Sequence, residues 1–78
     1  MWEVWYSLEA ANYLNDNGAL VAELFFAVEE LAVNAGWPQT GDYQLTDGLI
    51  LWQFRGHIVI YQRLEPQQVV QVAVIKPV

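Results

Sequence analysis

The sequence predicts a single α+β domain in which a helical hairpin covers one face of a small, antiparallel-rich sheet of four strands. Seventy-eight residues suffice for one domain with one core, spanning residues 1–78. Between residues 49 and 75, three short runs of β-branched and aromatic residues are separated by turn-forming sequences. Upstream, residues 19–34 repeat apolar side chains at helical spacing. The predicted order is therefore β-α-α-β-β-β.

The first strand and helix meet at Ser7. In the segment before it, Trp2, Val4 and Tyr6 alternate with Glu3 and Trp5, which is typical of a strand. The Ser7 hydroxyl can accept a hydrogen bond from the first turn of a helix over residues 8–14. A glycine in the left-handed conformation, at position 18, is expected to end that helix.

The main helix is predicted over residues 19–34. One broad face of it is apolar and is expected to lie on the core; this face comprises Leu20, Val21, Leu24, Phe25, Val28, Leu31 and Ala32. The opposite face carries glutamates but also Phe26 and Val33. Two readings of this pair stay open: packing against the first helix or a terminus, or a docking patch for another chain.

Three strands are predicted over residues 49–54, 58–64 and 69–75, with a further extended segment at residues 43–45 before an Asp47-Gly48 turn. A loop around Gly56-His57 divides the first two of these strands into two faces. The bulkier face is expected to lie under the helices; it comprises Ile50, Trp52, Phe54, Val59, Tyr61 and Arg63. The other, mixed face is expected to be exposed or to form a groove; it comprises Leu51, Gln53, Arg55, Ile58, Ile60 and Gln62.

Charge and composition disfavour several classes of function. Nine acids against three bases give a net charge of −6, which disfavours general nucleic-acid binding because that binding depends on Lys and Arg. Every base follows Phe54, so a local, mildly basic patch stays open. The chain has no cysteine, no basic N-terminal leader pattern and no run of apolar residues long enough to span a membrane, so we expect a soluble cytoplasmic protein without membrane association.

Other chemical motifs are absent or weak. A single histidine and no cysteine do not make a usual zinc site, and the isolated glycines do not make a phosphate loop. The neighbouring acids Glu29 and Glu30 are expected on a solvated helix surface. We therefore expect no metal and no cofactor.

Five segments follow one another in a recognisable order. They are residues 3–10, with hydrophobic residues leading to Ser-x-x-Ala; the helix over 20–31; residues 44–52, where Leu45, Gly48 and Trp52 lead into the sheet; the Val59-Ile60-Tyr61 strand; and the last strand over 69–75. In this order the chain resembles the RelE/ParE superfamily of bacterial toxins from type II toxin–antitoxin pairs. The resemblance spans nearly the whole chain. It implies that family's fold, an antitoxin-like partner and, in its ribosome-dependent members, cleavage of messenger RNA.

The sequence departs from that family at the residues on which cleavage depends. Ribonuclease members carry Lys and Arg on the open sheet face, because attack of a ribose hydroxyl on phosphate builds negative charge that cations stabilise. The position before Val59, usually Arg in the family, is Ile58, and another family Arg aligns with Gln53. The basic and aromatic C-terminal segment of the family is reduced to Lys76-Pro77-Val78. A diverged member with weak or lost ribonuclease activity is expected.

The remaining candidate catalytic residues are Arg55, His57, Arg63 and Lys76. In one reading they meet at an edge of the sheet as a relocated phosphate site, with His57 as the acid or base because its pKa normally lies near neutrality. In the other, the two arginines balance nearby acids and His57 occupies a turn.

Three functions follow from these readings. The first is a toxin-like component of a toxin–antitoxin pair that acts on RNA and the ribosome or on gyrase, although the charge does not favour the nucleic-acid targets. The second is a non-catalytic interaction module of the same fold that binds a partner or itself, with Phe26 and Val33 as candidate contacts. The third is a small ligand-binding domain.

Overall fold

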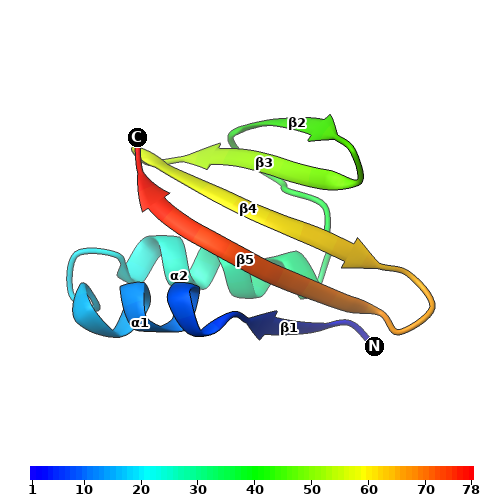
Figure 1. The fold of residues 1–78 in the computed structure, drawn as a ribbon, viewed down its shortest axis with the longest axis horizontal. Helices are drawn as coiled ribbons and strands as arrows, with labels where there is room; N and C mark the ends of the chain where they lie inside the picture. The colour runs from blue at the N-terminus through cyan, green and yellow to red at the C-terminus, as the bar shows by residue number, and fades with distance from the viewer.

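The structure, a computed structural model, describes all 78 residues and has two layers, a sheet and a pair of helices (Figure 1). Both helices lie on the same side of the sheet, and the other side carries no secondary structure. In chain order the elements are β1 Glu3–Tyr6, α1 Leu8–Asp16, α2 Ala22–Glu29, the 3₁₀ helix η1 Glu30–Ala32, β2 Asp42–Thr46, β3 Leu49–Phe54, β4 His57–Leu64 and β5 Val69–Pro77. Neither helix combines the length and apolar character needed to cross a bilayer.

The sheet has five strands in the order β1-β5-β4-β3-β2, where four were expected. The additional strand is β2, which pairs antiparallel with β3 from Asp42↔Gln53 to Thr46↔Leu49. β1 is parallel to β5, and the other neighbours are antiparallel, so the sheet is mixed. The α+β class and the helix-covered face are confirmed, whereas the four-strand count is wrong.

Two tight turns set the register of β2, β3 and β4. Asp47 and Gly48 both have positive φ, at 52° and 80°, and so do Arg55 and Gly56, at 50° and 77°. Two consecutive positive φ values define the type I′ turn, whose twist suits a two-residue hairpin. The second turn lies one residue earlier than expected, so His57 is not a turn residue but the first residue of β4.

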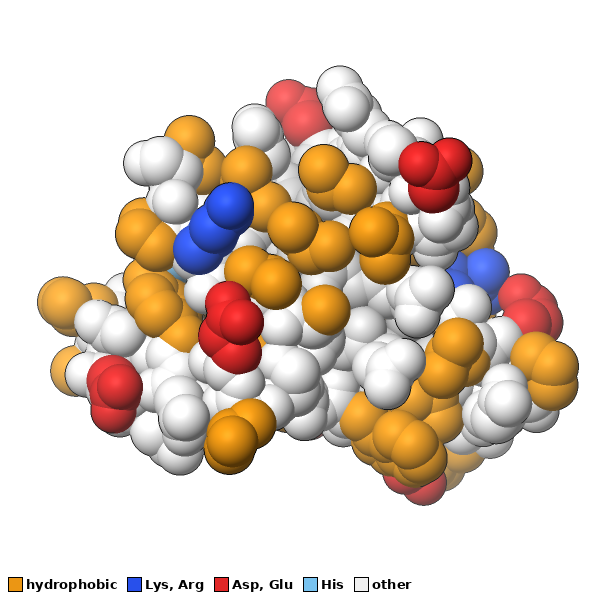
Figure 2. All heavy atoms as spheres, in the orientation of Figure 1, with side chains coloured by type: hydrophobic (Ala, Val, Ile, Leu, Met, Phe, Trp, Pro, Cys, Tyr) orange, Lys and Arg blue, Asp and Glu red, His pale blue; other side chains and the backbone are white.

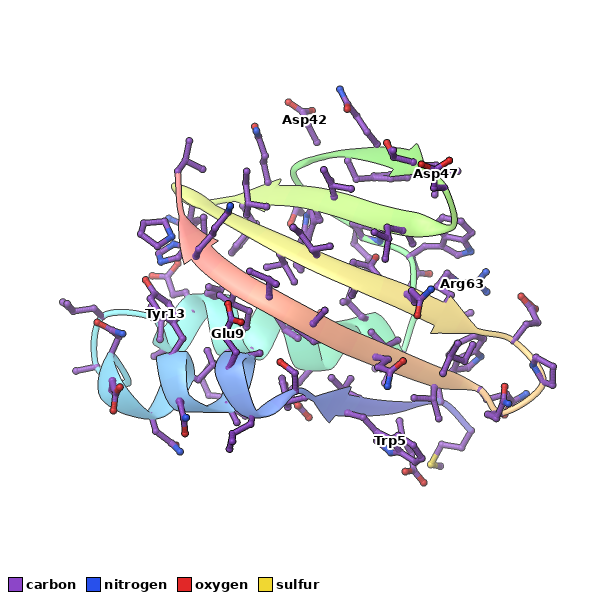
Figure 3. The ribbon with its side chains drawn as sticks, viewed as in Figure 1. Trp5, Glu9, Tyr13, Asp42, Asp47 and Arg63 are labelled. Carbon is purple, nitrogen blue, oxygen red and sulfur yellow. The ribbon has the colours of Figure 1, made fainter.

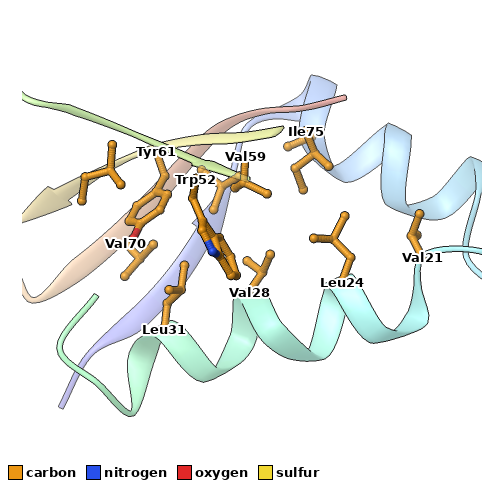
Figure 4. Packing of buried hydrophobic residues seen from close by; sticks show 12 residues of the cluster. Val21, Leu24, Val28, Leu31, Trp52, Val59, Tyr61, Val70 and Ile75 are labelled. Atoms are coloured by element: carbon orange, nitrogen blue, oxygen red, sulfur yellow. The ribbon is translucent and has the colours of Figure 1, made fainter. Parts of the chain in front are cut away.

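The core lies between the helices and the inner face of the sheet (Figure 4). Trp52 and Tyr61 lie at its centre, under Val28 and Leu31 of the helical layer. The Trp52 indole donates to the Thr40 carbonyl (2.7 Å), so the largest core side chain carries no unsatisfied polar group. Four of the six residues expected on the inward face of β3 and β4 are buried, namely Ile50, Trp52, Val59 and Tyr61.

The second helix is shorter than the sequence pattern suggested, whereas α1 runs two residues past its expected end at Leu14. The segment expected as one helix over residues 19–34 is α2 followed by η1, where hydrogen bonds such as Val33 N–H to Glu30 C=O tighten the last turn. Leu20, expected in the core, precedes α2 and is 88% exposed. Gly18 does not take the left-handed conformation; instead Asn17 ends α1, and its side-chain amide donates to the Tyr13 carbonyl.

Ser7 joins three elements. Its hydroxyl accepts from the Ala10 N–H (3.0 Å), which confirms it as the N-cap of α1, and it donates to the Ala73 carbonyl of β5 (2.6 Å). Ala73 is the extra residue of a β-bulge, because Ile60 pairs with Val74 and Tyr61 with Val72. The bulge carbonyl is thus satisfied by the residue that turns the chain from β1 into α1.

Candidate functional site

The face of the sheet away from the helices, the open sheet face, has an apolar centre. Leu51, Ile60 and Val74 lie side by side across β3, β4 and β5, since Leu51 pairs with Ile60 and Ile60 with Val74. Ile58 extends this row toward the β3–β4 turn. All four residues are half-buried, and Figure 2 shows hydrophobic side chains gathered over these strands. We call Leu51, Ile58, Ile60 and Val74 the apolar centre.

Polar residues surround the apolar centre, and they include an acid, Asp42 of β2, which pairs with Gln53 and lies on the same face. Glutamines frame it on three strands: Gln44 on β2, Gln53 on β3 and Gln62 on β4. A hollow of about 230 Å³ lies where Leu51 and Ile58 meet the β2 residues. The face is therefore hollowed beside β2 and carries few charges, which suits a protein segment better than a nucleic-acid backbone.

Lys76 is the only cation on the open sheet face. It pairs with Ile58 in the β4–β5 register near the C-terminal end of β5, so it borders the apolar centre. It is exposed and takes part in neither of the two ion pairs of the structure.

His57 lies on the helix side of the sheet. Its Nε2 is 2.8 Å from the Tyr13 hydroxyl of α1, and its Nδ1 is 3.2 Å from the Arg55 carbonyl. The Tyr13 and His57 rings also meet edge to face, with centroids 5.7 Å apart. These contacts fix the imidazole between the first helix and the β3–β4 turn.

Arg55 turns toward the helices and not toward the open sheet face. Its Nε lies 2.9 Å from a Glu23 carboxylate oxygen of α2, and its guanidinium lies over the Phe54 ring at 5.7 Å. Arg55, Glu23 and His57 border a hollow of about 440 Å³ that is otherwise lined by α2 and the loop before it. Glu23 opposes the charge of Arg55 there, so the hollow offers no excess of positive charge to a phosphate.

Arg63 is held at the far end of β4. Its Nε donates to the Ala35 carbonyl (2.7 Å), and its guanidinium lies 4.4 Å from the Trp37 ring centroid and 4.9 Å from that of Trp2. An ion pair with Glu65 (3.2 Å) completes its contacts. Two aromatic rings, a carbonyl and a carboxylate of the protein itself therefore contact this guanidinium.

The four candidate catalytic residues do not form one cluster. His57 and Arg63 are six positions apart on β4, which corresponds to about 20 Å. Figure 3 shows Tyr13, the partner of His57, and Arg63 at opposite ends of the sheet. Arg55 and His57 are brought together on the helix side, while Lys76 faces the other way. The reading in which both arginines balance nearby acids matches their two ion pairs, whereas the reading of His57 as a turn residue is wrong.

Phe26 and Val33 are both exposed, at 64% and 83%. Phe26 lies against Phe25, with centroids 5.9 Å apart, and borders a groove of about 310 Å³ whose walls include Trp37 and Phe54. Val33 follows η1 and does not line this groove. The role of the two residues as partner contacts stays a prediction.

The partners of the polar side chains have no signal in the local sequence. Tyr13 and His57 are 44 positions apart, and nothing in their local sequence pairs them. The place of Val74 in the apolar centre depends on the bulge at Ala73, which shifts the alternation of side chains along β5 by one residue.

The described chain contains no group of three or more His, Asp or Glu side chains placed to hold a metal ion. Comparisons with protein-family models, with curated proteins and with solved structures find no match to this chain.

Proposed function

We propose that the chain is a toxin-like protein-binding module, which receives an apolar segment of a partner protein on its open sheet face and cleaves RNA weakly or not at all. The observation that carries this proposal is the composition of that face: four adjoining apolar side chains framed by glutamines, with Asp42 on the β2 side and a single cation, Lys76, on the β5 side. The proposal combines two of the functions expected from the sequence: the chain is a diverged toxin-like protein, and it acts by binding a partner.

Burial of the apolar centre supplies the driving force for binding. Each partly exposed Leu, Ile or Val that a partner covers contributes about 25 cal/mol per Å² of apolar area removed from water. The surrounding glutamines offer amide groups that can bond to a partner backbone, which is how polar rims of interfaces contribute specificity.

The charges argue against RNA as the main ligand. Two of the three bases are engaged, Arg55 by Glu23 and Arg63 by Glu65, and the whole chain carries −6. The affinity of a protein for RNA increases with each Lys or Arg that contacts an RNA phosphate. Lys76 alone, the one base outside the two ion pairs, would add little affinity.

The partner is expected to be an antitoxin-like protein that places an apolar segment over Ile60 and an acidic side chain near Lys76. Lys76 lies beside the apolar centre and makes no ion pair within the chain, so its ammonium is available to a carboxylate of the partner. Self-association through the same face is the competing outcome.

Complex formation with the protein encoded by the neighbouring gene tests the proposal. The two proteins are co-expressed and the complex is isolated by size-exclusion chromatography. Ile60→Lys should abolish the complex, because it places a charge in the middle of the apolar centre. Leu20→Lys, which changes an 88% exposed leucine on the opposite layer, serves as the matched control and should leave the complex intact. A complex that withstands Ile60→Lys would show that the partner binds elsewhere.

Induction in a bacterial host tests the weak or absent ribonuclease activity. We expect growth and protein synthesis to continue after induction of the wild-type chain. Rapid arrest of translation that Arg55→Ala abolishes would overturn this part of the proposal.

Residual RNA cleavage at the hairpin end is the second candidate function. The specific observation in its favour is the 2.8 Å contact between His57 Nε2 and the Tyr13 hydroxyl, two groups able to exchange a proton, beside the hollow that Arg55 borders. Cleavage of messenger RNA on purified ribosomes, lost in both His57→Gln and Tyr13→Phe, would support this alternative.

A further inference from the structure

We infer that β2 is a dimerisation edge, along which two copies of this chain pair antiparallel about Gln44 and join their sheets into one of ten strands. The inference goes beyond the proposed function, because β2 pairs through its backbone edge while the partner segment would lie on the open sheet face. It rests on the exposure of β2, on the direction of its free backbone groups and on the placement of its charges.

The outer edge of β2 is unprotected. β2 lies at one edge of the sheet, next to β3, and all five of its residues are exposed. An edge strand with free N–H and C=O groups is a template for pairing with another chain, and proteins usually block it with lysines, prolines or bulges. Residues 42–46 contain none of these. The other edge strand, β1, is a four-residue strand that begins with a glutamate and runs directly into Ser7 and α1.

The Asp47-Gly48 turn fixes which backbone groups of β2 point outward. In a two-residue hairpin the pair that flanks the turn, here Thr46 and Leu49, is a hydrogen-bonded pair. Pairs alternate along an antiparallel ladder, so Gln44 also bonds to β3, whereas Tyr43 and Leu45 direct their N–H and C=O groups away from it.

One register satisfies all of these outward groups. With the two-fold axis at Gln44, Tyr43 lies opposite Leu45 of the second copy and Leu45 lies opposite its Tyr43. Each of these two pairs exchanges two hydrogen bonds, which makes four bonds. With the axis at Tyr43, Leu45 would lie opposite Gly41, which precedes β2, and with the axis at Leu45, Tyr43 would lie opposite the turn residue Asp47.

The side chains of β2 suit this register. Tyr43 and Leu45 lie on the same face of β2, are 44% and 63% exposed, and would cover each other across the new strand pair. Asp42 would lie opposite Thr46, and not opposite another acid. Figure 3 shows Asp42 and Asp47 at the two ends of β2, so no charge lies in the middle of the paired edge.

The interface is small. Five residues a side fall short of the roughly 1,200 Å² of a standard stable interface, so we expect a weak dimer that forms at high protein concentration. Analytical ultracentrifugation of the wild-type chain, up to about 1 mM, should show a monomer–dimer equilibrium.

Amide hydrogen exchange gives a test that needs no variant. At low concentration the amides of Gln44 and Thr46 should exchange slowly and those of Tyr43 and Leu45 quickly, because only the first two bond to β3. At high concentration the amides of Tyr43 and Leu45 should also become slow. A chain that remains monomeric at about 1 mM, or exchange at these two amides that does not change with concentration, would overturn the inference.

Two variants locate the contact. Leu45→Pro removes an outward N–H and leaves the β2–β3 ladder its bonds, so it should weaken the dimer about tenfold or more, since two of the four bonds are lost. Leu45→Lys should weaken it by placing two charges on the paired edge, and Leu20→Lys is its matched control on an exposed leucine elsewhere. If Leu45→Pro disrupts the hairpin, as its Trp52 fluorescence would reveal, Leu45→Lys decides. A dimer that persists in a folded Leu45 variant would show that another surface forms it.

Discussion

Arg63, one of the candidate catalytic residues, is held by contacts within the chain itself. It carries a charge near the end of a strand, yet its guanidinium lies between two indole rings and donates to the Ala35 carbonyl. Gly36 lies so close that a Cβ there would be 2.9 Å from Arg63 Cγ. Arg63 thus connects Trp2 near the N-terminus and the loop after η1 to the end of β4.

Replacing Arg63 with Lys should destabilise the fold although the charge is kept. Lysine cannot stack its ammonium between Trp2 and Trp37 as a planar guanidinium does, so we expect a loss of about 1–2 kcal/mol of unfolding free energy in urea titrations. Arg55→Lys is the control: its ion pair with Glu23 is exposed, and the change should stay within about 0.5 kcal/mol. Equal effects at both positions would contradict this account.

Removing the Tyr13 hydroxyl should loosen the β3–β4 turn from α1. Tyr13→Phe deletes the hydrogen bond to His57, and we expect unfolding free energy to fall by about 1 kcal/mol. The Tyr43 hydroxyl makes no hydrogen bond within the chain, so Tyr43→Phe should be close to neutral in the same urea titration. A neutral Tyr13→Phe would mean that the contact contributes nothing to stability.

At the scale of elements, the β2–β3 hairpin depends on two glycines with the same backbone conformation but different surroundings. Gly41 and Gly48 both have φ of 80°. A Cβ on Gly41 would lie 2.3 Å from the Gln53 carbonyl oxygen, whereas a Cβ on Gly48 would meet nothing within 4 Å. The first glycine allows close approach of two backbones, and the second only supplies a left-handed turn residue.

Alanine at these two positions separates the two roles. Gly48→Ala should cost about 1 kcal/mol for the left-handed conformation alone. Gly41→Ala should cost about 1–3 kcal/mol more, because the Gln53 backbone must move. Thermal unfolding of both variants followed by circular dichroism measures the difference, and equal losses would contradict the close approach.

The sequence predicts those elements whose pattern is local. The period-two runs in β3 and β4 identify their buried residues, and Ser7 identifies the start of α1, because each signal lies within a few residues. β2 was not counted as a strand because its residues are mostly polar; it is extended because the turn at Asp47 lays it along β3. The contacts of His57 and Arg63 were not predictable, since their partners lie 44 and 28 positions away.

At the scale of the whole molecule, two tyrosines couple stability to alkaline pH. The Tyr6 hydroxyl donates to the Glu29 carboxylate, and burial, with that carboxylate as a second cause, raises the pKa of Tyr6 above its ordinary 10.0. Burial likewise raises the pKa of Tyr61, whose hydroxyl donates to the Gly36 carbonyl (2.8 Å). Both hydroxyls therefore stay protonated in the folded protein at a pH where the unfolded chain has begun to lose those protons.

Stability should fall as the pH rises above about 10. Below that pH both states bind these protons and nothing changes; above it the unfolded state releases them while the folded state keeps them, so unfolding is favoured. Urea titrations between about pH 9 and pH 11 should show the loss, and Tyr6→Phe should reduce its steepness. The same pH dependence in both proteins would contradict a part for Tyr6.

The parallel pairing of β1 with β5 has a consequence for biosynthesis. Glu3 lies beside Val69 and Tyr6 beside Val72, so the first strand to leave the ribosome finds its place only after the last strand has been translated. Contacts between such distant positions form slowly, because a long loop must close first. Until then the nascent chain holds two tryptophans of its first five residues without their native neighbours, and ribosome-bound chains that stop before Val69 should recruit chaperones more readily than released ones.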